Sequence, residues 1–267
     1  MEDRRCKMLA VERKSKIIDL LEARGQAEVS ELAQMLSVVP ETIRRDLKEL
    51  EMQGVLQRTH GGAVLAEKKE ADTLHSLRIK QHYKEKVKLC KKAAQFIEEG
   101  DTIFVDNSTT LLNLIRFINP EYSVTLLTNS VDVLQLASTL ENQVTVISSG
   151  GVLHREKMYL SGSIAEYMHT EFIPSKAFIS CYGISLEYGL SDCSMNEAAF
   201  KKNMMQVSQK TFCIVDHTKF EKNGPVKLTG IDACDVLITD KRLEPRYQEM
   251  LQSDNVIMDI FHCEERE

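Results

Sequence analysis

The sequence has 267 residues, 43% of them hydrophobic and 28% charged, with a formal net charge of −6. This length allows two domains with buried cores, and the composition is typical of a soluble globular protein. We expect a cytoplasmic chain without membrane association, because it has no run of about 18 uncharged apolar residues and its charged N-terminal segment lacks the apolar core of a signal peptide.

Three helices and a β-hairpin are predicted within residues 1–65. Each helix has apolar residues at helical spacing: Ile17, Leu20 and Leu21 in the first, Val29, Leu32, Ala33 and Leu36 in the second, and Ile43, Leu47 and Leu50 in the third. Gly25 ends the first helix and Gly54 the third, while Pro40 suits the first position of the third. Residues 55–64 alternate in the manner of a small β-wing, broken by Gly61-Gly62.

The outward face of the third helix suggests contact with DNA. At about 100° per residue, Arg45 points away from the buried stripe, with Glu41 and Lys48 beside it. Arg44 and Thr42 flank this face. An arginine fork suits guanine edges or phosphate. Residues 1–65 hold 11 basic and 11 acidic residues, so DNA binding has to be argued from local placement of charge. A merely solvated charged face is the alternative, which the preceding short helix and the basic wing disfavour. The predicted DNA-binding residues are Thr42, Arg44, Arg45, Lys48, Arg58, His60, Gly61 and Gly62.

The segment 29–65 resembles the helix-turn-helix signature of the DeoR family of bacterial regulators, most specifically at residues 42–47 (TIRRDL) and 58–63 (RTHGGA). The resemblance implies that the third helix enters the major groove and that the wing contacts the DNA backbone. Two positions depart from the family pattern: Ser37 stands where the family usually has Gly, and Val39 where it usually has Ser. Val39 has no side-chain oxygen to cap the third helix, a loss of about 1 kcal/mol that Pro40 partly offsets by fixing φ.

Residues 66–83 form a polar stretch, which we interpret as a linker. Beyond it, short apolar runs alternate with helical stretches, a pattern that predicts a largely parallel α/β sheet covered on both faces. The predicted strands are 102–105, 124–127, 144–147, 177–179, 212–215, 236–238 and 256–258, and the predicted helices are 111–118, 131–140, 197–207 and 243–251. The expected organisation is therefore a DNA-binding domain over 1–65, a linker over 66–83 and an α/β sensor domain over 84–267.

Polar residues of the second domain follow the predicted strands. Ligands of open α/β sheets bind beyond the carboxyl ends of the strands, so these segments should converge on one cleft. The segment Ser108–Thr110 would open the next helix and suit an anion such as phosphate. Each such residue is individually more often a helix cap than a ligand contact, and the convergence carries the prediction. The candidate effector-binding residues are Asp106, Ser108, Thr109, Thr110, Thr128, Asn129, Ser130, Gly150, Gly151, Lys157, Glu197, Asp216 and Lys219.

The resemblance to the DeoR family continues through this domain, at 85–86, 106–110, 128–130, 150–151, 157–162, 196–198 and 216–220. The C-terminal domain of that family is similar in fold to sugar-phosphate isomerases and coenzyme A transferases, and it senses phosphorylated sugars or related metabolites. Ser108 replaces a glycine of the family's phosphate loop, which restricts the approach of the backbone to an anion. Cys181-Tyr182 replaces the usual Ala-Asp, so one carboxylate is missing.

The leading hypothesis is a repressor whose affinity for double-stranded operator DNA is lowered by a phosphorylated sugar. A homodimer or homotetramer is expected, because paired half-sites need a symmetric protein. The first alternative is a sugar-phosphate isomerase that carries a DNA-binding module, in which Asp106, Glu197, Asp216 and Lys219 would act as acid–base groups. The second is a DNA-binding protein whose C-terminal domain only dimerises. The seven scattered cysteines contain no C-x-x-C pair, and we expect reduced thiols, no metal site, no cofactor and no catalytic residue.

Overall fold

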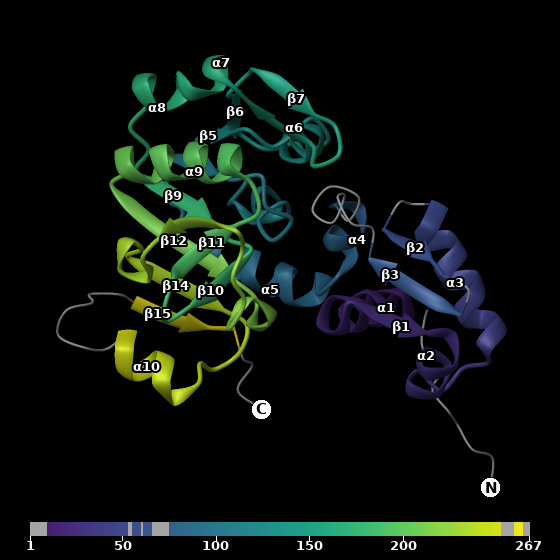
Figure 1. Cartoon of the computed structure of the whole chain (residues 1–267). Helices are drawn as coiled ribbons and strands as arrows, with labels where there is room; N and C mark the ends of the chain where they lie inside the picture. The colour runs from purple at the N-terminus through teal and green to yellow at the C-terminus, as the bar shows by residue number, and fades with distance from the viewer. Residues whose placement is uncertain (1–9, 53–54, 60, 66–74, 252–258, 264–267) are drawn as a thin grey trace, which may run out of the picture. The chain divides into compact units, whose positions relative to one another are not determined.

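The computed structural model describes residues 10–52, 55–59, 61–65, 75–251 and 259–263 (Figure 1). The chain divides into two compact units, residues 1–81 and 82–267, and each has its own hydrophobic core. This division falls near the end of the stretch interpreted as a linker, whose residues 66–74 lie outside the described ranges. Within the described ranges, no helix combines the length and apolar character that a membrane span requires.

The N-terminal unit has the predicted helices and wing, with one additional strand. Its elements are α1 (Ala10–Arg24), β1 (Gln26–Glu28), α2 (Val29–Met35), α3 (Pro40–Met52), β2 (Leu56–Arg58), β3 (Gly62–Leu65) and α4 (His75–Lys80). The unpredicted strand β1 pairs antiparallel with β3, giving the sheet order β1-β3-β2. The predicted apolar faces are buried together, Ile17, Leu32 and Ile43 completely, and Leu77 of α4 packs against the same core.

The turn between α2 and α3 explains one departure from the family pattern. Ser37 adopts the left-handed conformation, with a φ of 53°. The amide of Val38 donates to the carbonyl oxygen of Ala33 over 3.0 Å, as in the Schellman motif that ends many helices. Glycine is the usual residue at this left-handed position because it has no Cβ to crowd the backbone. Ser37 therefore occupies a place where a side chain costs free energy.

We expect Ser37→Gly to raise the free energy of unfolding of the N-terminal unit by about 0.5–1 kcal/mol. A non-glycine residue costs about 1–2 kcal/mol in the left-handed region, and the greater flexibility of unfolded glycine returns part of that gain. Urea unfolding followed by circular dichroism measures the change, with Ser37→Ala as the control. A similar gain in both variants would show that the turn geometry is not the cause.

The second unit is built on a seven-stranded parallel sheet, which confirms the predicted fold class. Its strands are β4 (Thr102–Val105), β5 (Thr125–Thr128), β6 (Thr145–Ser148), β9 (Lys176–Ile179), β12 (Lys210–Val215), β14 (Val236–Thr239) and β15 (Asp259–His262). The strand order is β15-β14-β12-β9-β4-β5-β6, and every neighbouring pair is parallel. From β4 the chain adds β5 and β6 on one side, and then returns to place β9 on the other side of β4. The carboxyl ends of β4 and β9 therefore form a topological switch point.

Both faces of this sheet are covered (Figure 1). Side chains of alternate residues enter opposite cores: Phe104 lies in one, and Ile103 and Val105 in the other. The core containing Ile103 is closed by α5 (Tyr83–Ala94), the 3₁₀ helix η1 (Leu114–Phe117) and α6 (Val131–Ala137). The opposite core is closed by α7 (Ser163–Glu166), α8 (Met168–Glu171), α9 (Met195–Val207), α10 (Pro245–Leu251) and a small antiparallel sheet of β10 (Gly183–Ser185), β11 (Gly189–Asp192) and β13 (Val226–Thr229). The hairpin of β7 (Val152–His154) and β8 (Tyr159–Ser161) and the 3₁₀ helices η2 (His217–Lys219) and η3 (Ile231–Ala233) complete the unit.

The predicted α-helix over residues 111–118 is wrong. Turns and the short η1 replace it, and the amide of Leu114 donates to the carbonyl oxygen of Leu111 in place of an i−4 partner. The Sγ atom of Cys90 on α5 donates to the carbonyl oxygen of Thr110, and this tertiary contact uses an oxygen that would otherwise join a helical ladder. The apolar spacing of the segment still places Leu111 and Leu114 in the core. The predicted strand over 256–258 lies outside the described residues, and β15 begins directly after it.

Candidate functional sites

The third helix presents its basic side chains to solvent. Leu47 and Leu50 are buried against the core, which turns Arg44, Arg45 and Lys48 outward. The side chain of Arg45 is 82% exposed, the largest fraction among the arginines in the described ion pairs. Thr42 is only partly exposed, at the side of this face. The predicted outward face of α3 is therefore present, with Arg45 most accessible to a macromolecular partner.

A hollow lies between α3 and the wing. It is lined by Val29, Arg44, Leu47, Arg58, Thr59, Gly61 and Gly62. Four of the predicted DNA-binding residues thus line one hollow: Arg44 of α3, Arg58 of β2, and the Gly61-Gly62 pair of the wing. His60, also predicted to bind DNA, lies outside the described residues.

Gly62 has a structural role at this wing. A Cβ on Gly62 would lie 2.0 Å from the carbonyl oxygen of Ala27, because β3 pairs closely with β1 at this point. A Cβ on Gly61 would meet no atom of the described residues within 4 Å. The glycine pair therefore contains one residue that the packing requires and one that it does not.

At the switch point of the sensor sheet, Asp106 joins the ends of two strands. Asp106 follows β4 and is only 1% exposed. Its Oδ1 accepts from the amide of Ser108 over 2.9 Å, and its Oδ2 accepts from the amide of Ser180, after β9, over 2.8 Å. Because both oxygens are engaged by the protein backbone, this carboxylate positions the loops after β4 and β9.

A buried lysine that the sequence analysis did not select neutralises this carboxylate. Lys201, on α9, is 4% exposed, and its Nζ lies 3.1 Å from Asp106 Oδ2. The same ammonium donates to Asp192 Oδ2 over 2.8 Å and to the carbonyl oxygen of Ser180 over 2.5 Å. Burial alone would lower the pKa of Lys201, but Asp192 and Asp106 raise it above its ordinary value. Burial raises the pKa of Asp192 despite its contact with Lys201.

Beside this group, Glu197 pairs with a predicted lysine. Its Oε2 accepts from Lys157 Nζ over 2.7 Å, and its Oε1 accepts from Asn107 Nδ2 over 2.7 Å. Burial alone would raise the pKa of Glu197, but Lys157 and Asn107 hold it below its ordinary value. The loop after β4, the β7–β8 hairpin region and α9 are thus tied together.

A second set of cationic groups adjoins the ends of β4 and β12. Lys86 on α5 donates to Thr109 Oγ1 over 3.0 Å, and Lys219 Nζ lies 5.8 Å from the ring centroid of Tyr182. Asp216 is 1% exposed. Burial would raise the pKa of Asp216, but Lys219, a hydrogen bond from Thr218 and, to a smaller extent, His82 and Lys86 hold it below its ordinary value.

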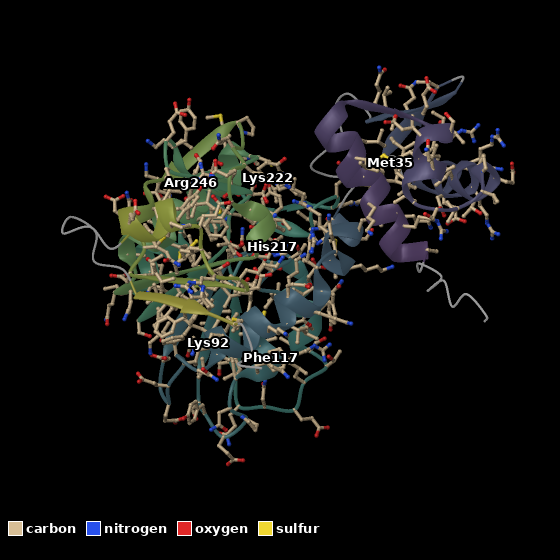
Figure 2. The ribbon with its side chains drawn as sticks, turned by 90° about the horizontal axis from the view of Figure 1, so that it is seen from below. Met35, Lys92, Phe117, His217, Lys222 and Arg246 are labelled. Carbon is tan, nitrogen blue, oxygen red and sulfur yellow. The ribbon has the colours of Figure 1, made fainter. Side chains whose placement is uncertain are left out.

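The imidazole of His217 also lies at the carboxyl edge of the sheet, after β12 (Figure 2). His217 Nδ1 lies 2.7 Å from Asp240 Oδ2, and the ring of His82 meets the His217 ring edge-on, with a centroid separation of 5.8 Å. The ends of β12 and β14 and the start of α5 are thereby brought together.

Three buried polar atoms at the carboxyl edge of the sheet have no hydrogen-bond partner among the described residues: Asn129 Oδ1, after β5, Ser180 Oγ, after β9, and Thr239 Oγ1, at the end of β14. A buried polar group without a partner costs free energy unless a ligand or water satisfies it. Thr128 and Ser130, next to Asn129, have local roles. Thr128 Oγ1 donates to the carbonyl oxygen of Val105, and Ser130 Oγ accepts from the amide of Val133 as the N-cap of α6.

Gly150 and Gly151 follow β6, where both have positive φ angles of 65° and 106°. A Cβ on Gly151 would lie 2.4 Å from the carbonyl oxygen of Ser161, so this turn needs glycine to pack on β8. The predicted residues that come after β4, β5, β6 and β12 therefore all lie at the carboxyl ends of strands in one parallel sheet. Ser108–Thr110 do not open an α-helix, and the expected helix-terminus anion site is absent there.

Lys86 and Lys201 could have been found from the sequence by one signal. Each falls on the apolar stripe of its helix, Lys86 three residues before Leu89 and Lys201 three residues before Met204. A lysine in such a position is buried only when it is paired. Among the described residues, no group of three or more His, Cys, Asp or Glu side chains is placed to hold a metal ion.

Each of the two units matches a known protein family. Residues 13–69 match the DeoR-like helix-turn-helix domain, and residues 81–241 match the DeoR C-terminal sensor domain. The uncharacterized HTH-type transcriptional regulator YulB of Bacillus subtilis is 34% identical over 93% of this chain and 96% of its own length. The L-fucose operon activator of Escherichia coli is 31% identical, over 86% and 95%. The lactose phosphotransferase system repressor of Lactococcus lactis is 29% identical, over 92% and 97%.

Among solved structures, a D-ribose-5-phosphate isomerase in complex with phospho-erythronic acid matches 52% of this chain and 54% of its own. The TM-score is 0.38 and the sequence identity 14%.

Proposed function

Because the chain belongs to the DeoR family of helix-turn-helix transcriptional regulators, we propose that it represses genes of sugar metabolism and that a phosphorylated sugar relieves this repression. Two of its relatives are named for the control of sugar systems, one as a repressor and one as an activator. In this proposal the winged helix of residues 1–65 binds operator DNA, residues 66–83 link the domains, and residues 84–267 bind the effector in the cytoplasm.

The exposed face of α3 supports the DNA-binding assignment. Arg45 is the most accessible arginine on it, and Arg44 and Arg58 border the hollow beside the wing. We assign Arg45 to base edges in the major groove, where an arginine fork reads guanine. Lys48, Thr42 and the wing contact phosphates, which fix the register of the protein on the duplex.

We expect Arg45→Ala to weaken operator binding by about 1–3 kcal/mol and to leave binding to scrambled DNA nearly unchanged. Lys48→Ala should weaken binding to both duplexes and reduce the salt slope by about one. Fluorescence anisotropy on a duplex selected from a random-sequence pool by the wild-type chain, and on its scrambled version, measures both effects. Unchanged operator affinity in both variants, with the fold intact by circular dichroism, would remove α3 as the recognition helix.

The observation that carries the effector assignment is the meeting of cationic and unsatisfied polar groups at one edge of the sheet. Lys86 and Lys219 adjoin strand ends around the switch point, where an anionic ligand would be attracted, and Lys157 lies in the same region with its charge paired to Glu197. Asn129 Oδ1 and Ser180 Oγ are buried polar atoms that sugar hydroxyls would satisfy. We therefore propose a ligand that combines a phosphate group with several hydroxyl groups.

We propose that this ligand is bound without turnover. Both oxygens of Asp106 and both oxygens of Glu197 already accept hydrogen bonds from the protein, so neither carboxylate is poised to remove a substrate proton. The alternative, an isomerase with a DNA-binding module, is tested by incubating the chain with candidate sugar phosphates and following products by NMR. Isomerisation at enzymatic rates would favour that alternative.

We also propose a homodimer or homotetramer, since operators with paired half-sites require symmetric binding.

A further inference from the structure

The arginines of the proposed DNA-binding face are each paired with a glutamate of α3 itself. Arg44 Nη1 lies 3.0 Å from Glu41 Oε2, and Arg45 Nε lies 3.4 Å from Glu49 Oε1. On the wing, Arg58 Nε lies 3.9 Å from Glu51 Oε2.

The backbone amide of Arg58 also donates to Glu51 Oε1 over 3.0 Å. Glu49 pairs in addition with Lys14 of α1, and this hydrogen bond holds the pKa of Glu49 below its ordinary value, so it is ionised at neutral pH. Three carboxylates therefore stand among the arginines that a DNA phosphate would approach.

These ion pairs contribute little to the stability of the fold, so their effect on DNA binding has to be considered. The side chains of Arg44, Arg45 and Arg58 are 59%, 82% and 44% exposed, and exposed pairs of this kind add at most about 1 kcal/mol each. Their main effect is on the electrostatic attraction between these arginines and DNA. A carboxylate within 4 Å of an arginine neutralises its attraction for phosphate and repels the phosphate itself.

Building on the function proposed above, we infer that Glu41, Glu49 and Glu51 form an acidic guard that sets DNA specificity. On random DNA a guanine meets Arg45 in the right register only by chance, so the arginines mainly find phosphates, and each exchanges one anionic partner for another with little gain. An operator also offers a guanine edge to Arg45, which would bind it through two hydrogen bonds, whereas Arg58 on the wing contacts phosphate on both kinds of DNA. The guard therefore weakens binding to random DNA more than binding to the operator, and the ratio of the two affinities rises.

The experiment replaces the guard in the full-length chain with E41Q/E49Q/E51Q. Glutamine keeps the size and an acceptor oxygen of each side chain and removes its charge. We expect affinity for a scrambled duplex to rise about tenfold at constant salt, since each exposed pair is worth about 1.4- to 5-fold. The plot of log K against log salt should steepen by about one to three. Affinity for the duplex selected by the wild-type chain should rise less, so that the specificity ratio falls.

The control is E121Q/E141Q/E249Q, which makes the same change in net charge at exposed positions of the sensor unit. The inference is overturned by unchanged affinity for scrambled DNA, or by an equal rise in the control. Loss of operator affinity without a gain on scrambled DNA would also overturn it and would make the glutamates base readers. If the wild-type chain itself prefers no sequence, the proposed function fails. If it discriminates and the guard variant matches it, only the guard is lost.

Discussion

Lys201→Met is expected to lower the free energy of unfolding of the sensor unit by about 3–5 kcal/mol. The substitution leaves Asp106 and Asp192 buried at 1% and 9% exposure without their shared cation, and removing one partner of a buried ion pair carries this cost. For a unit of this size the loss corresponds to a fall in Tm of roughly 6–20 °C. Differential scanning calorimetry of the full chain measures it. Lys202→Met, an exposed neighbour on α9, is the matched control.

The pH dependence of this variant identifies the cause. Without Lys201 the pKa of Asp192, already raised by burial, should rise further, so the folded state binds the proton more tightly than the unfolded state. The stability lost at pH 8 should then be partly regained toward pH 5. In the wild type, Glu197 and Asp216 have lowered pKa values, so their contribution is lost only as pH falls below about 4. Equal transitions for Lys201→Met and Lys202→Met, or a loss that grows toward pH 5, would contradict the assigned role of Lys201.

Gly62→Ala is expected to abolish operator binding and to destabilise the N-terminal unit by at least about 1–3 kcal/mol, the usual cost of overpacking. The new methyl group would lie 2.0 Å from the carbonyl oxygen of Ala27 and 2.9 Å from its carbonyl carbon, both of which are backbone atoms that a rotamer change cannot move. Separation of β1 from β3 would displace the wing that carries Arg58. Anisotropy with operator DNA and calorimetry of the N-terminal transition measure the two effects.

Gly61→Ala provides the matched control for this prediction. It adds the same methyl group one residue away, where the added Cβ has no neighbouring atom within 4 Å in the part of the chain that the structure describes. We expect near-normal stability and a much smaller loss of operator binding than in Gly62→Ala, and effector binding by the sensor unit should be unchanged in both variants. Similar losses in Gly61→Ala and Gly62→Ala would show that both positions need glycine for contact with DNA, and the packing explanation would be wrong.

The sequence allowed the fold to be predicted where local pattern and tertiary structure agree. The apolar stripe of α3 turned Arg45 outward as expected, and six strands of the parallel sheet fell within one or two residues of their predicted bounds: β4, β5, β6, β9, β12 and β14. The short strands β7, β8, β10, β11 and β13 were not predicted. The segment 111–118 failed because its spacing of apolar residues is satisfied equally by turns and a 3₁₀ helix. In the structure the second arrangement is present, and Cys90, 20 residues earlier, donates to the carbonyl oxygen of Thr110 beside it.

The residues at the candidate site could be predicted from the sequence, but their hydrogen-bond and ion-pair partners could not. Parallel strands must end at one edge, so the positions of Asp106 and Asn129 followed from the strand pattern. Which partners these side chains take did not follow. Asp106 is engaged by Lys201 from a helix 95 positions later in the sequence, and a pairing at such a distance has no local signature. Strand β1 was missed because three residues are too short to show alternation.

The central claim is that occupancy of the sensor site and binding of operator DNA oppose each other. A regulator of this kind must show reciprocal linkage: a ligand that lowers DNA affinity by some factor binds the DNA complex more weakly by the same factor. Lys219→Ala should lower the affinity of the chain for the ligand. It should leave the DNA affinity measured without ligand nearly unchanged, since Lys219 belongs to the sensor unit.

The direct measurement is calorimetric titration of a sugar phosphate, first identified by thermal shift, into the free chain and into its complex with operator DNA. We predict that the dissociation constant is about 5- to 150-fold larger in the complex, the range of typical allosteric coupling. Equal constants in the two titrations would contradict the account, because the ligand would then carry no signal to the DNA-binding domain.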